Sequence, residues 1–372
     1  MHETSCEHSF LESLQTPGKP CIHPWFYLWI NAAGDATVCP QNRIRLGSLE
    51  QFSLPELWNN ETIRNIRQFF LEGDYEKGGC ERECPYLRGV YTHAAQPIPP
   101  RELIFPDIDP RRLDPSGKAS SNLRQGIEDY RSQRLYAEAL PAVLDCQSIL
   151  ACNAGCIMCG QPHASKLKHS PKIKDEIEKA GQYLSAIRWQ GGEVFLDKNF
   201  THDVQVIGEA GDEAIRKIII TNGSLLDAQK IDAILNLRGD TRFIVSMDGA
   251  VPETVNTIRY HLDHAKIFGT ITVLADRQKQ VGRNDLVLWN YTVMRSNIDE
   301  VTLAITIADS LGVDINLAAI QGNYPNENFF EFPLVEPEQW ERYLISWEAS
   351  AARASITVSG IEGLRHRYRY RC

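Results

Sequence analysis

Three cysteines stand close together in the middle of the chain. Cys152, Cys156 and Cys159 follow a C-x3-C-x2-C spacing, which places three thiols on one short loop with no fourth cysteine beside them. Thiolates are soft ligands that suit zinc and iron–sulfur clusters. Because a closed structural zinc site needs four ligands, three cysteines favour a cluster with one iron left open for chemistry.

Three short segments downstream of this loop each follow or end an apolar run that is typical of a strand. They are Trp189–Glu193 (WQGGE), Ile220–Gly223 (ITNG) and Val245–Gly249 (VSMDG). A zinc site completed by His163, four residues after Cys159, would fit the thiols. That alternative leaves the three downstream segments unexplained.

The cysteine loop and the three segments, in this order, closely resemble the radical S-adenosylmethionine (radical SAM) superfamily over roughly residues 141–320. The resemblance implies that Cys152, Cys156 and Cys159 hold a four-iron four-sulfur cluster, and that S-adenosylmethionine (SAM) binds its open iron. One electron from the cluster would then cleave SAM to a 5′-deoxyadenosyl radical, which abstracts a hydrogen atom from the substrate.

The resemblance also assigns cofactor contacts on the loop and after the next strand. Met158 stands where the family often carries an aromatic residue near the adenine, and a methionine offers a soft apolar surface there. Gly191 and Gly192 permit a close approach of the backbone to a ligand. Glu193 would complete the site for the methionine ammonium group.

The remaining cofactor contacts are expected at the ends of two further strands. Thr221 and Asn222 would contact the ribose or the carboxylate of SAM, although they also fit a helix cap. Ser246 and Asp248 would contact the cofactor or the substrate. Arg259 fits either a partner of the SAM carboxylate or, preferably, a solvated helix charge.

A second set of four cysteines lies near the N-terminus: Cys21, Cys39, Cys80 and Cys84. Gly34 and Asp35 supply turn chemistry between two apolar stretches on either side. The module resembles the twitch domain, a shortened relative of the SPASM domain, which implies one auxiliary four-iron four-sulfur cluster. It departs from the family by preceding the barrel, and four cysteines also permit structural zinc.

The groups that complete the reaction are not evident from the sequence, so the catalytic residues stay unknown. Cys146 lies within a strand and fits a buried apolar position. The terminal Cys372 fits a free thiol better than a hydrogen-atom donor. Five histidines fit surface or hydrogen-bonded structural positions better than catalytic bases: His93, His169, His202, His261 and His264.

Strands and helices alternate from about residue 144 onward, which predicts an α/β fold with parallel strands. The resemblance implies a partial (β/α)6 barrel, with its active site at the carboxyl ends of the strands. We expect a cluster module at 1–95, a proline-rich linker and helix (120–139) at 96–140, the barrel at 141–320 and a C-terminal extension at 321–372.

Composition limits the function classes. The 372 residues carry a net charge of −9, which argues against a protein that wraps nucleic acid. The N-terminus lacks the basic and apolar regions of a signal peptide, and no apolar run approaches the ~18 residues that cross a membrane. Ten cysteines without an export signal indicate metal or redox use, so we expect a cytoplasmic protein.

We therefore expect a radical SAM enzyme that oxidises a sugar- or aminocyclitol-like small molecule. The alternatives are peptide modification, as an epimerase, a cross-linker or a thioether former, and a non-enzymatic iron–sulfur or zinc module. The expected partners are a small-molecule substrate, with a peptide as the alternative, and an external one-electron reductant such as flavodoxin or ferredoxin.

Overall fold

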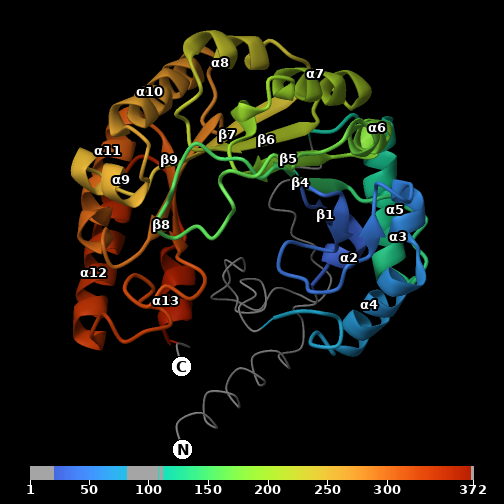
Figure 1. The fold of residues 1–372 in the computed structure, drawn as a ribbon, viewed down its shortest axis with the longest axis horizontal. Helices are drawn as coiled ribbons and strands as arrows, with labels where there is room; N and C mark the ends of the chain where they lie inside the picture. Colours follow the sequence, from blue (N-terminus) through green and yellow to red (C-terminus); the bar gives the residue numbers. More distant parts are fainter. Residues whose placement is uncertain (1–20, 82–107, 109–111, 370–372) are drawn as a thin grey trace, which may run out of the picture.

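The computed structural model of the protein describes residues 21–81, 108 and 112–369. Its centre is one curved sheet of ten strands, in the order β10-β9-β8-β7-β6-β5-β4-β1-β2-β3. The six middle strands are parallel, which confirms the predicted partial barrel (Figure 1). They are β4 (Val143–Ile149), β5 (Ala186–Gly191), β6 (Arg216–Thr221), β7 (Asp240–Ser246), β8 (Val287–Val293) and β9 (Asp314–Ala319).

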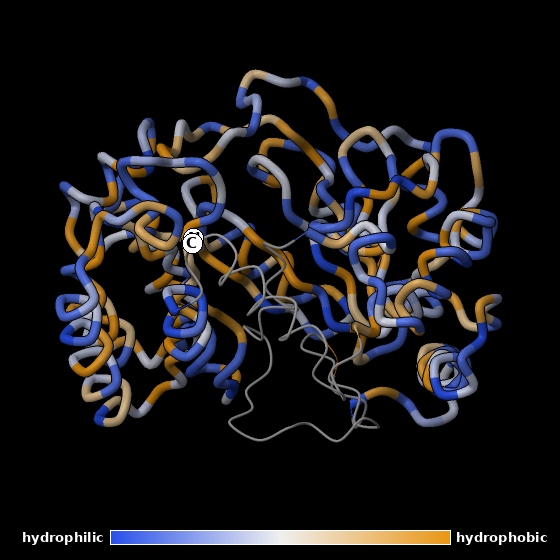
Figure 2. The backbone as a smooth tube through the Cα atoms, turned by 90° about the horizontal axis from the view of Figure 1, so that it is seen from below, coloured by the Kyte–Doolittle hydropathy of each residue, from blue (hydrophilic) through white to orange (hydrophobic). Residues whose placement is uncertain are grey.

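Helices cover the outer, convex face of this sheet (Figure 1). They are α6 (Pro171–Ala180), α7 (Phe200–Ala210), α8 (Ala228–Leu235), α9 (Pro252–Ile258), α10 (His264–Gln280) and α11 (Val301–Leu311), with 3-10 turns η1 (Gly181–Tyr183), η2 (Val194–Leu196) and η3 (Ile298–Glu300). Figure 2 shows hydrophobic and hydrophilic residues alternating along these helices, as expected where one side packs on a core.

The two faces of the sheet differ in polarity. In β8, Trp289 and Tyr291 are fully buried on the outer face, whereas Asn290 and Thr292, which alternate with them, are half-buried on the inner face. Strands β7 and β9 show the same alternation of buried and half-buried residues. Since side chains alternate across a strand, the inner surface of the barrel carries the polar residues.

The N-terminal module shares this sheet. Strand β1 (Tyr27–Ile30) pairs parallel with β4, while β2 (Asp35–Thr37) and β3 (Gly47–Ser48) continue it antiparallel. The predicted turn is confirmed, because Gly34 has a φ of 83°. The first apolar stretch does not begin as a strand: α2 (His23–Phe26) is helical, with Pro24 in its first turn, where proline is favoured.

Three further helices complete this part of the fold: α3 (Leu54–Trp58), α4 (Glu61–Glu72) and α5 (Lys118–Arg131). Helix α3 packs on α6 and α4 on α2, while α5 contacts both α2 and η1. Arg67 is fully buried and donates to the carbonyls of Pro24, Trp58 and Leu135, and burial lowers its pKa to about 9. The helix predicted at 120–139 ends early, because Gln133 has a φ of 55°.

The C-terminal extension lengthens the sheet. Strand β10 (Val358–Ser359) pairs parallel with β9, α12 (Pro337–Arg353) packs on α11, and α13 (Ile361–Arg369) contacts β9. Gly360 has a φ of 95°, and a Cβ there would lie 1.9 Å from Leu317 O, so only glycine fits. Within the described ranges, none of the helices has the length and apolar character needed to cross a lipid bilayer.

Candidate functional site

The cysteine loop follows β4 at the carboxyl edge of the sheet. Its backbone is fixed from two sides. Cys152 N donates to His163 O (3.1 Å), and Ile157 N donates to Ile258 O (3.0 Å), just before the end of α9. The loop is therefore held open between its own return segment and the segment after β7.

The three loop thiols are half-buried and unpaired by disulfides. Burial raises the pKa of Cys156 to about 11, although the Arg259 cation acts in the opposite direction. Burial likewise raises the pKa of Cys152. A thiolate left alone here is costly, and coordination to a cation would offset that cost. The donor set therefore fits an iron–sulfur cluster.

No three His, Cys, Asp or Glu side chains in the described part of the chain are grouped so as to hold one metal ion. The thiols of Cys152, Cys156 and Cys159 are thus not gathered around a single point. A cluster carries several irons, each with its own thiolate, and does not require that convergence.

Gly191, the last residue of β5, and Gly192 pack directly against the backbone around the cysteine loop. Gly192 N donates to Ile149 O (2.7 Å), and Glu193 N donates to Ala151 O (2.8 Å). A Cβ on Gly192 would lie 1.9 Å from Ala151 O, and one on Gly191, at φ 147°, would lie 2.1 Å from Ile149 O. The contact that demands glycine in this structure is therefore with the backbone beside the cysteines.

Glu193 joins two of the segments that the sequence singled out. Its buried carboxylate accepts from Thr221 Oγ1 (2.7 Å), Asn222 N (2.8 Å) and Phe195 N (3.2 Å). Burial raises the pKa of Glu193, and these donors oppose the rise. The carboxylate ties the end of β5 to the end of β6.

Asn222 connects the end of β6 to the cysteine loop. Its Nδ2 donates to Asn153 Oδ1 (2.9 Å) and lies 4.0 Å from Cys152 Sγ. The helix-cap interpretation of Thr221 and Asn222 is wrong, because the next helix, α8, is capped by Asp227. The sequence did not single out Asn153, although its place between Cys152 and Cys156 was an available signal.

Asp248 and Arg259 form a buried ion pair beside the loop. Asp248 Oδ2 lies 2.7 Å from Arg259 Nη2, and Arg259 Nη1 lies 3.9 Å from Cys156 Sγ. The preference for a solvated Arg259 is wrong, since only 7% of it is exposed. Burial acts to lower its pKa, but the Asp248 carboxylate outweighs it and the pKa is raised. The positive charge of Arg259 thus faces the Cys156 sulfur.

The backbone around Asp248 is fixed by neighbouring strands. Asp248 Oδ1 accepts from Thr292 N (2.7 Å), and the fully buried Asn297 donates to Asp248 O (3.2 Å). Ser246 lies half-buried at the end of β7 on the inner face, and Met158 is half-buried against the core. The predicted cofactor residues therefore lie around one edge of the sheet.

The second cysteine set is described for Cys21, Cys39 and Cys80, whereas Cys84 lies outside the described residues, as do His93 and Cys372. Cys21 Sγ lies 3.1 Å from His23 Nδ1. Burial, helped by Cys21 and Cys80, raises the pKa of the Tyr75 hydroxyl to about 12. Both cysteines therefore lie near one tyrosine.

The loop after Cys39 reaches the segment before Cys80. Asn42 Nδ2 donates to Gly78 O (2.7 Å), and Arg43 N donates to Gly79 O (2.9 Å). The segments that carry Cys39 and Cys80, far apart in sequence, thus lie side by side.

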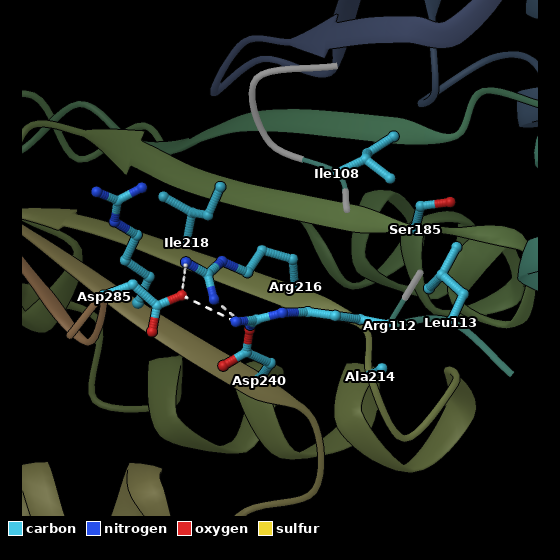
Figure 3. A pocket seen from close by; sticks show the side chains of 10 residues that line it. Ile108, Arg112, Leu113, Ser185, Ala214, Arg216, Ile218, Asp240 and Asp285 are labelled. Carbon is cyan, nitrogen blue, oxygen red and sulfur yellow. Dashed lines mark hydrogen bonds and ion pairs between the residues drawn. The ribbon is translucent and has the colours of Figure 1, made fainter. Parts of the chain in front are cut away.

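A cavity of about 170 Å³ lies at the opposite, amino end of the strands (Figure 3). Arg216 bonds Asp240 and lies 2.9 Å from Asp285, while Arg112, which precedes α5, lies 2.7 Å from Asp240. These ion pairs tie the segment before α5 to the base of the barrel. The cavity is remote in the fold from the cysteine loop, which follows the carboxyl ends of the strands.

Solved structures with similar folds include radical SAM enzymes, at low identity. Streptococcus suis SuiB bound to precursor peptide SuiA shares 12% identity over 89% of this chain and 70% of that chain, with a TM-score of 0.47. Native anSMEcpe with bound AdoMet and Cp18Cys peptide shares 16% over 58% and 62%, with a TM-score of 0.43. A radical SAM methyltransferase from Sphaerobacter thermophilus shares 15% over 58% and 66%, also at 0.43.

The chain thus spans less than two thirds of the length of anSMEcpe. No curated protein sequence matches the chain.

Two sequence families match the chain where the two cysteine sets lie. Residues 147–302 match the Radical SAM superfamily, and residues 21–85 match SPASM, an iron-sulfur cluster-binding domain. Together the matches cover more than half of the chain and contain every cysteine of both sets. The chain therefore belongs to the radical SAM superfamily and carries a SPASM domain at its N-terminal side.

Proposed function

We propose that this enzyme removes a hydrogen atom from a polar substrate held inside the barrel, using SAM bound at the cysteine loop. One observation carries the proposal. The loop and the strand leading into it touch all three downstream segments, through Gly192 with Ile149, Asn222 with Asn153, and Arg259 with Cys156. An electron carrier alone would not need this arrangement around its cluster.

Cys152, Cys156 and Cys159 would hold the radical cluster. The chemistry supplied by the bound cluster and SAM is reductive cleavage of the sulfonium, giving a radical that removes hydrogen from an unactivated C–H bond. Arg259 would attract the SAM carboxylate, because it is a buried cation beside the loop. An external reductant such as flavodoxin or ferredoxin would supply the electron.

The remaining predicted residues would position SAM. Met158 would lie against the adenine, and Ser246 would contact the ribose or the substrate. Glu193 and Asn222 would affect SAM binding indirectly, because their polar groups already bind Thr221 and Asn153. We assign these two a positioning role at the cysteine loop.

The substrate we favour is a hydroxylated small molecule such as a sugar or an aminocyclitol. The inner face supplies half-buried polar groups for it, including Asn290 on β8 and Asn316 on β9. Oxidation of a secondary alcohol removes a hydrogen atom from carbon, the hydroxyl proton and one more electron. That electron needs an acceptor.

The second cysteine set would hold the group that accepts this electron. Cys21, Cys39, Cys80 and Cys84 are enough to ligate one four-iron cluster completely. A fully ligated cluster has no open iron for a substrate, so its role would be electron transfer.

Peptide modification is the second candidate. The side-chain amides of Asn290 and Asn316 on the inner face favour it, because primary amides pair well with peptide groups. SuiB has been solved with a precursor peptide and anSMEcpe with a Cp18Cys peptide. A peptide substrate would use the same cysteine loop and the same SAM chemistry.

Iron content and SAM cleavage test the proposal. Anaerobically reconstituted protein should contain about eight irons, and a Cys152/Cys156/Cys159→Ala triple variant about four, on a four-iron count per cluster. The parent should form 5′-deoxyadenosine from SAM under dithionite, and the variant should not. Full cleavage activity in the triple variant, or no iron in the parent, would refute the proposal.

A further inference from the structure

A row of uncharged polar side chains crosses the inner face of the sheet at a single level. Ser246 on β7 is the register partner of Asn290 on β8, and Asn290 is that of Asn316 on β9. Asn316 in turn pairs in register with Ser359 on β10. All four are half-buried. Register partners in parallel strands point to the same face, so the four side chains form one continuous row, here called the amide row.

The hydrogen bonds of the amide row run in one direction. Ser359 Oγ donates to Asn316 Oδ1 (3.0 Å) and also lies 3.4 Å from Ile315 O. The hydroxyl has a single proton, and Asn316 Oδ1 is the nearer of the two acceptors, so the serine donates to the Asn316 side chain. Asn316 then turns its Nδ2 to Asn290 Oδ1, at 2.8 Å. The orientation of Asn290 is thus set two strands away.

Asn290 is left with its amino group facing away from Asn316. Within the described residues, neither Asn290 Nδ2 nor the neighbouring Ser246 hydroxyl has a recorded hydrogen-bond partner. A half-buried donor without a partner is costly unless water or a ligand satisfies it. These two groups form the unsatisfied end of the row.

That unsatisfied end lies next to the cofactor edge. Ser246 is two residues before Asp248, which binds Arg259, and Arg259 reaches Cys156. A molecule on Asn290 would therefore sit between the end of β7 and the strands that close the barrel. The row itself contains no charge, so a carboxylate or phosphate would lack a counter-charge within it.

We propose that Asn290 binds the substrate by donating a hydrogen bond to an uncharged oxygen, either an alcohol or an amide carbonyl. Asn316 and Ser359 are positioning residues that hold the Asn290 amide in its donating orientation. This inference rests on the proposed function and narrows its substrate to molecules with such an oxygen near the reactive carbon. Alcohol and amide share this chemistry, and the test separates them.

The test uses reconstituted holoenzyme with SAM and two probes, myo-inositol and N-acetylglycinamide, in saturation-transfer NMR. The wild-type protein should transfer magnetisation to one of them. Asn290→Asp should weaken that signal about five-fold, the value of one neutral hydrogen bond. Transfer to myo-inositol identifies the alcohol, and transfer to N-acetylglycinamide identifies the amide. The control is Asn236→Asp, at the exposed end of α8.

A second variant should change the orientation of the Asn290 amide without replacing Asn290 itself. Asn316→Asp replaces the donor that faces Asn290 Oδ1, so the Asn290 amide should turn over and lose its donating orientation. The probe signal should fall as in Asn290→Asp. Ser359→Ala should weaken it less, and Ser359→Thr, which keeps the hydroxyl, should restore it. A purely structural role would not give this rescue.

Transfer to neither probe, or equal transfer in wild type and Asn290→Asp, would overturn the inference. SAM cleavage without substrate is measured on the same samples. We expect it to be unchanged in the control Asn236→Asp, whose side chain is exposed at the end of α8. Loss of cleavage in the wild type would instead overturn the proposed function, so the two failures are distinguishable.

Discussion

The two cysteine sets are built in opposite ways. Cys152, Cys156 and Cys159 lie within one loop, but that loop is held by residues at the ends of β5, β6 and α9. Cys21 and Cys80 stand far apart in sequence, yet both lie near Tyr75 in the N-terminal module. The first set is therefore contiguous in sequence, whereas the second is assembled from distant positions of the chain.

This difference determines which substitutions should disrupt each cluster. A change at the end of β5 or after α9 should disturb the radical cluster and leave the SPASM cluster intact. A change in the N-terminal hairpin should do the opposite, unless it reaches β1, which pairs with β4. The following variants test that separation, beginning with the largest expected effect.

Gly192→Ala should abolish the radical cluster. The new Cβ would lie 1.9 Å from Ala151 O, which forces the backbone beside Cys152 to move. Iron content should fall from about eight to about four per chain, on a four-iron count. Iron analysis and electron paramagnetic resonance measure this.

Gly269→Ala is the matched control, because a Cβ on Gly269 in α10 would meet nothing within 4 Å. It should keep all the iron and gain up to about 1 kcal/mol of helix stability. Cys39→Ala should also lose about four irons, but it should retain SAM cleavage. Identical losses of cleavage in Gly192→Ala and Cys39→Ala would contradict the separation of the two sites.

Arg259→Gln should destabilise the fold by about 3 kcal/mol, because it leaves the buried Asp248 carboxylate without its partner. Anaerobic urea unfolding measures the change. Loss of the cation beside Cys156 should also shift the radical cluster to a more negative reduction potential. Combining it with Asp248→Asn should cost less than the sum of the two single changes, and strict additivity would show that the pair is not coupled.

Glu193→Gln should cost about 2 kcal/mol, the value of hydrogen bonds to a charged group. The glutamine keeps the volume, but it cannot accept from Thr221, Asn222 and Phe195 together as the carboxylate does. Urea unfolding of the cluster-loaded protein should report the loss. Thr221→Val removes one of these donors, and a cost as large as that of Glu193→Gln would point to packing as the cause.

Much of the radical site could be predicted, because its motifs are contiguous. The cysteine spacing and the Gly-Gly-Glu segment at the end of β5 predicted the site, and in the structure the two segments are in contact. The roles of Glu193 and Arg259 were less accessible, since each depends on a partner from a distant segment. A single sequence shows a charged residue but not whether it is buried.

The amide row and the shared sheet were missed for a related reason. The alternation around Asn290 in β8 does indicate an inner polar face. Its alignment with Asn316 and Ser359 depends on strand register, which no local pattern specifies. The parallel pairing of β1 with β4 is likewise a long-range contact, and the unusual order of the two domains gave no guide to it.

His169 gives the smallest predicted effect and tests the contact between the two regions. It is buried, with Nε2 3.0 Å from Asn31 O in the turn after β1, which confirms a hydrogen-bonded structural histidine. Burial lowers its pKa to about 4. The unfolded chain takes up a proton near pH 6.5 and the folded one does not, so the stability held above pH 6.5 is lost as the pH falls toward 4. Between pH 7.5 and 5.5, wild type should lose about 1 kcal/mol more than His169→Gln, which keeps a donor for Asn31 O without titrating. If the urea midpoints of the two proteins change equally with pH across this range, the prediction is contradicted. Protonation of His169 would then not weaken the contact between the module and the barrel.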